Sequence, residues 1–207
     1  MNGLYAAKPW FVRRLKKIED LLVGWNVSPD SLTVAAFVVS LCCGLFLALG
    51  GILDKPLLWL LVPPLGLVRL ALNALDGSLA RRKGIDRPFG EVMNELSDRL
   101  SDVALIGPLA FTAPASLALT ALAATLISST AGLLGRAVLG DRISGGPMGK
   151  PDRVTVISLG ALASGVLASP VPLETSLWVI LAGAVVTAAA RVLTIRRRTF
   201  GGSHVRV

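Results

Sequence analysis

Side chains of the kind that bind metal ions and phosphate are concentrated between residues 69 and 102. Arg69, Asn73 and Asp76 recur every three or four residues, which places them on one face of a helix. A second face of this kind carries acidic and amide side chains: Glu91, Asn94, Glu95, Asp98 and Asp102. Oxygen ligands without histidine or cysteine suit Mg²⁺ or Mn²⁺ better than zinc. The pattern therefore predicts a divalent-metal site between two polar helix faces.

The segment that joins the two faces, residues 77–90, combines small residues with cations. Glycine lets a ligand approach the backbone closely, and arginine and lysine pair with phosphate oxygens. A divalent metal beside a cationic segment favours a phosphate or diphosphate substrate. The alternative is a polar bundle core of interhelical hydrogen bonds and salt bridges, as in many transporters.

The composition predicts that these faces belong to membrane helices. The 207 residues are 53% hydrophobic and only 16% charged, whereas soluble domains carry about 25% charged residues. A membrane span needs about 20 residues. We therefore expect an all-α membrane protein with six transmembrane helices, near residues 31–51, 56–79, 90–111, 115–138, 153–169 and 173–193. Charges at membrane depth cost about 2.5–3.5 kcal/mol each on insertion scales, so two facing polar stripes need a function.

Three parts are expected along the chain. Residues 1–27 form an interfacial amphipathic helix, residues 28–195 form the six-helix transmembrane domain, and residues 196–207 form a basic cytoplasmic tail. The first part mixes charges with apolar positions, with Leu15 and Leu22 among the residues expected to face lipid. An ordinary solvated helix is the alternative there.

The distribution of charge predicts the orientation in the cell membrane. All of the 21 Lys and Arg residues except Lys55 fall on one side of the six predicted spans or in the helix halves nearest to it. Because positive residues stay inside, we expect a multi-pass protein with both termini and the active site in the cytoplasm. The net charge of +8 then reflects topology and anionic lipid headgroups, and no nucleic-acid partner is expected.

The residues from Asn73 to Asp98 resemble the signature of the CDP-alcohol phosphotransferase family. Its fixed positions are matched here by Asp76, Gly77, Ala80, Arg81, Gly90 and Asp98. The family has Asp at all four acidic positions, whereas this chain is a variant with Asn73 and Asn94 at the first and third. The resemblance extends to the six spans, to the interfacial N-terminal helix and to the opening of the first span at residues 28–33.

The resemblance implies an integral-membrane transferase of phospholipid biosynthesis. Such an enzyme moves a phosphatidyl group from a CDP-linked lipid, such as CDP-diacylglycerol, to a small alcohol or alcohol phosphate and releases CMP. It implies Mg²⁺ or Mn²⁺ as cofactor, membrane lipid as surroundings and a homodimer as assembly.

The resemblance also assigns roles to individual residues. In the family the four acidic positions bind two divalent metals. The ligands here would be Asn73, Asp76, Asn94 and Asp98, and Asp98 would also take the proton of the acceptor hydroxyl. The cytidine diphosphate would lie against Gly77, Ala80, Arg81 and Gly90. In relatives, basic residues of the later loop contact the acceptor or lipid phosphate, which indicates Lys150 and Arg153. Plain positive-inside charge is the alternative for those two residues.

The amides at Asn73 and Asn94 remove two of the four formal negative charges of the motif. Three outcomes follow. The site binds one metal firmly and a second only with substrate, or neighbouring carboxylates at Glu91, Glu95 or Asp102 supply the missing charge. In the third outcome the protein binds CDP-lipid without turnover. An ion-coupled transporter is a further alternative, although an ion path needs no small residues beside cations.

Overall fold

The computed structural model describes residues 8–84, 88–141, 143 and 145–200. Helices account for nearly all of this part, and no strand occurs in it. The long helices are α3 (Pro29–Ile52), α4 (Val62–Lys83), α5 (Pro88–Ile106), α6 (Ala115–Leu139), α7 (Lys150–Leu167) and α8 (Val171–Phe200). A 3₁₀ helix, η2 (Pro56–Leu61), precedes α4, and another, η3 (Gly107–Phe111), follows α5. The all-α prediction is therefore confirmed for the described residues.

Four described segments are long and apolar enough to cross a membrane. They are Pro29–Ile52, Pro56–Lys83, Ala115–Leu139 and Val171–Phe200. Helices α5 and α7 are not among them. Helix α5 carries the second polar face, and α7 begins with the charged residues Lys150, Asp152 and Arg153.

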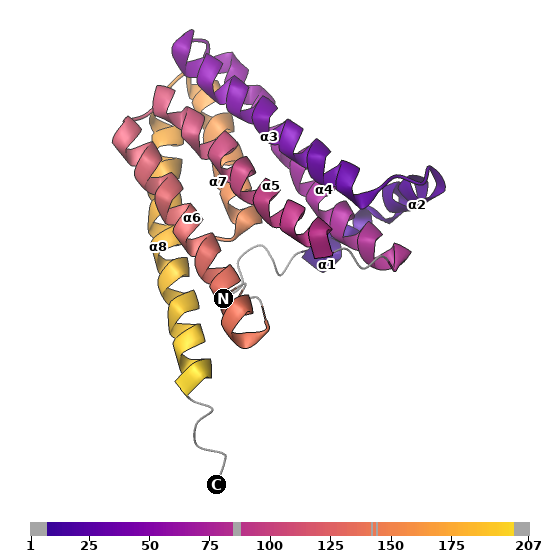
Figure 1. The fold of residues 1–207 in the computed structure, drawn as a ribbon. Coiled ribbons are helices and arrows are strands. Elements are labelled where there is room, and N and C mark those ends of the chain that lie inside the picture. Colours follow the sequence, from indigo (N-terminus) through magenta and orange to yellow (C-terminus); the bar gives the residue numbers. More distant parts are fainter. Residues whose placement is uncertain (1–7, 85–87, 142, 144, 201–207) are drawn as a thin grey trace.

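The two more polar helices join two pairs of apolar ones (Figure 1). Helices α3 and α4 pack along each other, and α6 runs beside α8. Helix α5 packs against α3 and α6, while α7 packs against α4 and α8. The arrangement places the charged helices between the apolar pairs, where their polar side chains can meet protein partners instead of lipid.

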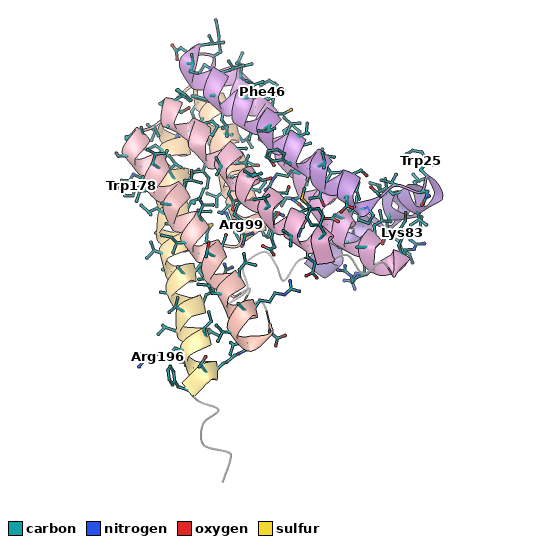
Figure 2. The ribbon with its side chains drawn as sticks, viewed as in Figure 1. Trp25, Phe46, Lys83, Arg99, Trp178 and Arg196 are labelled. Atoms are coloured by element: carbon teal, nitrogen blue, oxygen red, sulfur yellow. The ribbon has the colours of Figure 1, made fainter. Side chains whose placement is uncertain are left out.

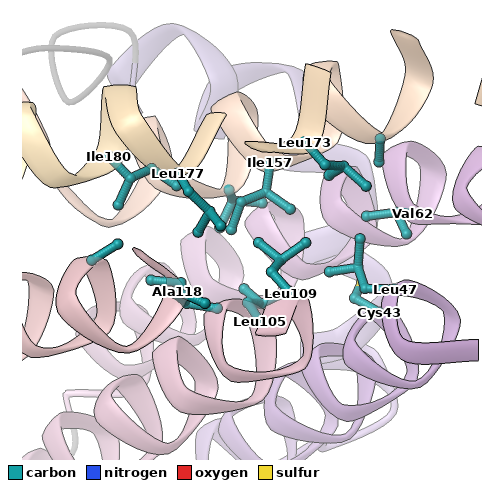
Figure 3. Close-up of a cluster of buried hydrophobic side chains, with 14 of the residues drawn as sticks. Cys43, Leu47, Val62, Leu105, Leu109, Ala118, Ile157, Leu173, Leu177 and Ile180 are labelled. Carbon is teal, nitrogen blue, oxygen red and sulfur yellow. The ribbon is translucent and has the colours of Figure 1, made fainter. Parts of the chain in front are cut away.

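The larger of the two apolar clusters in the described residues lies at the end of the bundle that is remote from the sequence motif. It is formed by the second half of α3, the start of α4, the end of α5, the first half of α6 and of α8, and α7. Figure 3 shows Leu47, Leu109, Ile157 and Leu177 converging there. The motif residues belong to the last turns of α4 and the first turns of α5, at the other end.

The outer surface of the bundle is strongly apolar. Side chains such as Val34, Leu45, Leu134 and Val185 are each more than half exposed. Exposed apolar patches of this extent are rare on soluble proteins, so this surface is suited to lipid.

The N-terminal part differs from the predicted single helix. It forms two helices, α1 (Lys8–Arg14) and α2 (Lys16–Gly24), with a turn at Leu15. Leu15 and Leu22, which the sequence pattern assigned to the lipid side, pack instead against buried leucines of α3 and α4. Residues 1–7 of this predicted part lie outside the described residues.

Polar contacts also hold this N-terminal part against the end of α4. Arg82 pairs with Asp20 at 2.5 Å, and Lys83 donates to Asn26 at 3.0 Å and to the Val27 carbonyl at 2.8 Å. Figure 2 shows Trp25 and Lys83 at this same corner of the molecule. At the other terminus, α8 continues to Phe200, and residues 201–207 of the predicted tail lie outside the described part.

Candidate active site

Asp76, the second position of the motif, is held by a residue of another helix. It lies on α4, is buried, and accepts a hydrogen bond of 2.8 Å from the Thr33 hydroxyl of α3. The start of α3 is capped by Ser28, whose hydroxyl oxygen accepts from the Ser31 amide at 3.1 Å. Such caps stabilise a helix start. The opening of α3 therefore places Thr33 where it orients the Asp76 carboxylate.

Asp98, the last position of the motif, forms a buried ion pair with Lys150. The Lys150 ammonium contacts Oδ1 of Asp98 and donates to Oδ1 of Asn73 at 3.0 Å. Both charged side chains are largely buried, with exposed fractions of 16% for Lys150 and 12% for Asp98. Three helices, α4, α5 and α7, are thus joined through one ammonium group.

Lys150 owes its position to a loop that is fixed on both sides. It is the first residue of α7, and the preceding Gly149 amide donates to the Asp152 carboxylate at 2.8 Å. The Met148 amide donates to the Thr187 hydroxyl of α8 at 2.9 Å. These bonds tie the loop to the start of α7 and to α8.

The three carboxylates considered as substitutes for the missing motif charges all have cationic partners. Glu91 pairs with Arg136 at 2.6 Å, Glu95 with Arg99 at 2.5 Å, and Asp102 with Arg153 at 2.7 Å. Arg99 of α5, labelled in Figure 2, also donates to the Ser129 carbonyl of α6 at 3.3 Å. Their charges are therefore compensated within the protein and add little to a metal site.

The residues assigned to the cytidine diphosphate are more accessible than the motif carboxylates. Gly77 and Ala80 on α4 and Gly90 on α5 are half-buried, and Arg81 is exposed. A Cβ atom placed on Gly77 would lie 3.5 Å from Nη1 of Arg81, which means that the guanidinium reaches back over this glycine. Asn94 on α5 is half-buried. Residues 85–87 of the joining segment lie outside the described part.

Arg69 lies deeper in the bundle than its neighbours on the first polar face. It is fully buried, and its Nε donates to the Ser40 hydroxyl at 2.6 Å. Among the described residues, no hydrogen-bond partner contacts its Nη1 and Nη2 atoms. The guanidinium lies within electrostatic reach of Asp98 and Asp102.

Sequence reasoning missed two polar residues around the site. Thr33 binds Asp76, and the only sequence signal for it was its place at the capped start of the first span. Arg191 of α8 is buried and donates to the carbonyl oxygens of Gly145 at 2.9 Å and Ser128 at 2.6 Å. No local pattern distinguishes Arg191 from the other cations of that segment.

The donor set fits one divalent cation by ligand type. Asp76 and Asp98 offer carboxylate oxygens, and the Asn94 amide offers a neutral oxygen, all suited to Mg²⁺ or Mn²⁺. The Lys150 ammonium binds oxygens of Asn73 and Asp98. Among the described residues, no group of three or more His, Cys, Asp or Glu side chains is placed to hold a metal. The residues therefore do not fit a pair of ions bound by four carboxylates.

No protein-family model matches the chain. The inner membrane protein YnbA of Escherichia coli is 36% identical over 177 residues, which are 84% of this chain and 87% of the relative. A phosphatidylinositol phosphate synthase of Mycobacteroides abscessus is 28% identical over 205 residues, covering 95% of this chain and 89% of the relative.

Solved structures share the fold. The crystal structure of phosphatidylinositol phosphate synthase (PgsA1) of Mycobacterium tuberculosis with CDP-DAG bound superposes with a TM-score of 0.70. It is 22% identical, and the match covers 94% of this chain and 98% of that one. The structure of the same enzyme with manganese and citrate also has a TM-score of 0.70, at 24% identity over 92% of each chain.

Two carboxylates of the motif lie at the same end of the bundle. Asp76 and Asp98 come from two helices to one end of the bundle, at the motif positions named above. With the similarity to YnbA and to phosphatidylinositol phosphate synthases over most of its length, the chain is a multi-pass membrane protein that belongs to the CDP-alcohol phosphotransferase family.

Proposed function

We propose that this protein is a phosphatidyltransferase of phospholipid biosynthesis that uses CDP-diacylglycerol and a small alcohol or alcohol phosphate, releasing CMP. The observation that carries the proposal is the pair of buried motif carboxylates, Asp76 and Asp98, held by partners from α3 and α7. Family membership supports the same activity, because relatives that match nearly the whole chain are phosphatidylinositol phosphate synthases.

In the reaction, the acceptor oxygen forms a bond to the phosphorus of the phosphatidyl group. The bond between that phosphorus and the bridging oxygen breaks, and CMP leaves. Asp98 accepts the proton of the acceptor hydroxyl, as a general base must lie within hydrogen-bond reach of it. The partly exposed residues Gly77, Ala80, Arg81 and Gly90 bind the cytidine diphosphate and orient it.

We assign Asn73, Asp76, Asn94 and Asp98 to the binding of Mg²⁺ or Mn²⁺. A divalent ion held there would supply positive charge to the diphosphate and so lower the cost of charge on the departing CMP. The acceptor or lipid phosphate is assigned to Lys150 and Arg153. Arg153 is paired with Asp102 at 2.7 Å. To bind phosphate, its guanidinium must contact the phosphate and the Asp102 carboxylate together, or give up its bonds to Asp102.

The membrane arrangement belongs to the proposal as well. Six transmembrane helices, α3 to α8 with η2 and η3, form one domain over residues 28–195, and residues 1–27 lie at the interface. Both termini, the basic tail from residue 196 and the active site face the cytoplasm, and two chains form a homodimer. The distribution of Lys and Arg supports this orientation.

A second function is favoured by the amides at Asn73 and Asn94. With fewer negative charges in the motif, the protein would bind a CDP-lipid without turnover.

Purified protein in detergent, given CDP-diacylglycerol, Mg²⁺ or Mn²⁺ and a panel of alcohols, separates the two functions through CMP release. The panel contains glycerol phosphate, inositol phosphate, serine and phosphatidylglycerol. We expect CMP release with at least one acceptor, and we expect EDTA to abolish it. Binding of CDP-diacylglycerol without CMP release from any acceptor would favour the second function.

A further inference from the structure

Buried charges of both signs lie around the motif. Among the described residues from α3 onward, the buried carboxylates are Asp76, Asp98, Asp102 and Asp152. Three cations lie near them: Arg153 pairs with Asp102, Lys150 contacts Asp98, and Arg69 lies within electrostatic reach of Asp98 and Asp102. Most of the negative charge of these carboxylates is therefore compensated by cations of the protein.

The two amides limit the negative charge of this region. With Asp in place of Asn73 and Asn94, the same region would carry two further negative charges, which repel one another when buried. A further divalent cation would then be needed to neutralise them. With the amides this demand is smaller, and bringing two divalent ions to the site would create an excess of positive charge.

Lys150 brings a positive charge directly to the motif. Its ammonium contacts two of the four motif positions at once, Oδ1 of Asn73 at 3.0 Å and Oδ1 of Asp98. A buried lysine is costly to desolvate, so its retention requires close anionic or polar partners. The loop bonds of Met148 and Gly149 hold it in this position. An ammonium binds oxygen by donating hydrogen bonds, whereas a metal ion accepts electron pairs from oxygen. Its positive charge nevertheless compensates the negative charge of Asp98.

We infer that the Lys150 ammonium replaces one of the two divalent cations of the family's site, so that each chain binds a single metal ion. The amides at Asn73 and Asn94 and the lysine form one set of compensating changes. This inference rests on the proposed function for the identity of the site. Asp76 and Asp98, with the Asn94 amide, remain as ligands for the one ion. The amide oxygen of Asn73, assigned above to the metal, accepts from Lys150 instead.

The test counts Mn²⁺ ions bound to the full-length protein in detergent, by equilibrium dialysis and metal analysis, with and without CDP-diacylglycerol. The wild type is expected to bind one Mn²⁺ per chain. The triple variant Asn73→Asp, Asn94→Asp, Lys150→Met is expected to bind two. Lys150→Met alone should still bind one, at least about tenfold more tightly, because a positive charge near the site is removed.

Lys55→Met is the matched control, since it removes a lysine between α3 and η2 at the opposite end of the bundle. Its Mn²⁺ count and affinity should equal those of the wild type. Two Mn²⁺ ions bound to the wild type would overturn the inference, and so would an unchanged Mn²⁺ affinity for Lys150→Met. The ion count of the wild type remains decisive even if the triple variant fails to fold. CMP release from the same preparations tests the proposed function separately. One bound ion without CMP release sinks only that function, and two ions with CMP release sink only the inference.

Discussion

The guanidinium of Arg153 and the carboxylate of Asp102 face each other as a buried two-bond pair. Nε of Arg153 donates to Oδ1 at 3.1 Å, and Nη2 donates to Oδ2 at 2.7 Å. Both side chains are at most 5% exposed. This pair connects α7 to α5 directly beside the residues of the motif, so it fixes the distance between the two polar helices.

Removing one member of this pair should destabilise the protein more than removing both. Arg153→Met leaves the Asp102 charge buried and unpaired, which costs about 3–5 kcal/mol. The double variant Arg153→Met, Asp102→Leu removes both charges and should recover much of that loss. Thermal unfolding in detergent measures the difference. Equal unfolding temperatures for the single and double variants would show that the unpaired Asp102 charge carries no such cost.

Asp98 is expected to be indispensable for CMP release, because the acceptor proton must go to a carboxylate at this position. Asp98→Ala should abolish release, whereas Asn94→Asp should retain it, since Asp only restores the charge usual in the family. Both variants are assayed with CDP-diacylglycerol, Mn²⁺ and the best acceptor. An Asp98→Ala variant with full activity would disprove the assignment of Asp98 as the base.

Thr33 should act on the reaction through Asp76. Thr33→Val keeps the shape of the side chain but removes the 2.8 Å hydrogen bond to Oδ2 of Asp76. Loss of a partner that orients a metal ligand typically costs about 10–100-fold in metal affinity or activity. The Mn²⁺ affinity and the rate of CMP release should both fall, and Thr33→Ser should restore them. If the valine variant binds Mn²⁺ as the wild type does, Thr33 has no positioning role.

A phosphate-binding role of Lys150 predicts a change in KM. Lys150→Met removes a charge-assisted hydrogen-bond donor, worth about 1.5–3 kcal/mol. The KM for a phosphorylated acceptor, or for CDP-diacylglycerol, should rise by about tenfold or more. Lys55→Met serves as the control with one positive charge fewer. An unchanged KM for both variants would leave Lys150 without a part in phosphate recognition.

The close contact of α3 with α5 depends on Gly44. A Cβ atom at this position would lie 2.0 Å from the carbonyl oxygen of Ala104. Gly44→Ala should therefore separate the helices and destabilise the fold by about 1–3 kcal/mol. Gly107→Ala is the control, because no atom lies within 4 Å of its added Cβ. Thermal unfolding of the two variants should differ clearly, and equal stability would show that the helices adjust without cost.

Much of the fold was accessible from the sequence because helix formation and apolar composition are local properties. The predicted span near residues 31–51 corresponds to α3, and the one near 115–138 corresponds to α6. The N-terminal part was harder to predict. An amphipathic pattern shows which side is apolar, but it does not show whether lipid or protein covers that side, and Leu22 packs on α4.

By itself, the sequence determined the helical membrane class and the motif from Asn73 to Asp98, since residue types and short spacings carry both. Only the tertiary structure decided which charges compensate one another. Lys150 meets Asn73 from 77 positions away along the chain, and Arg153 meets Asp102 across the space between α5 and α7. Electrostatic attraction depends on distance in space, which helix packing sets, and no local pattern records it.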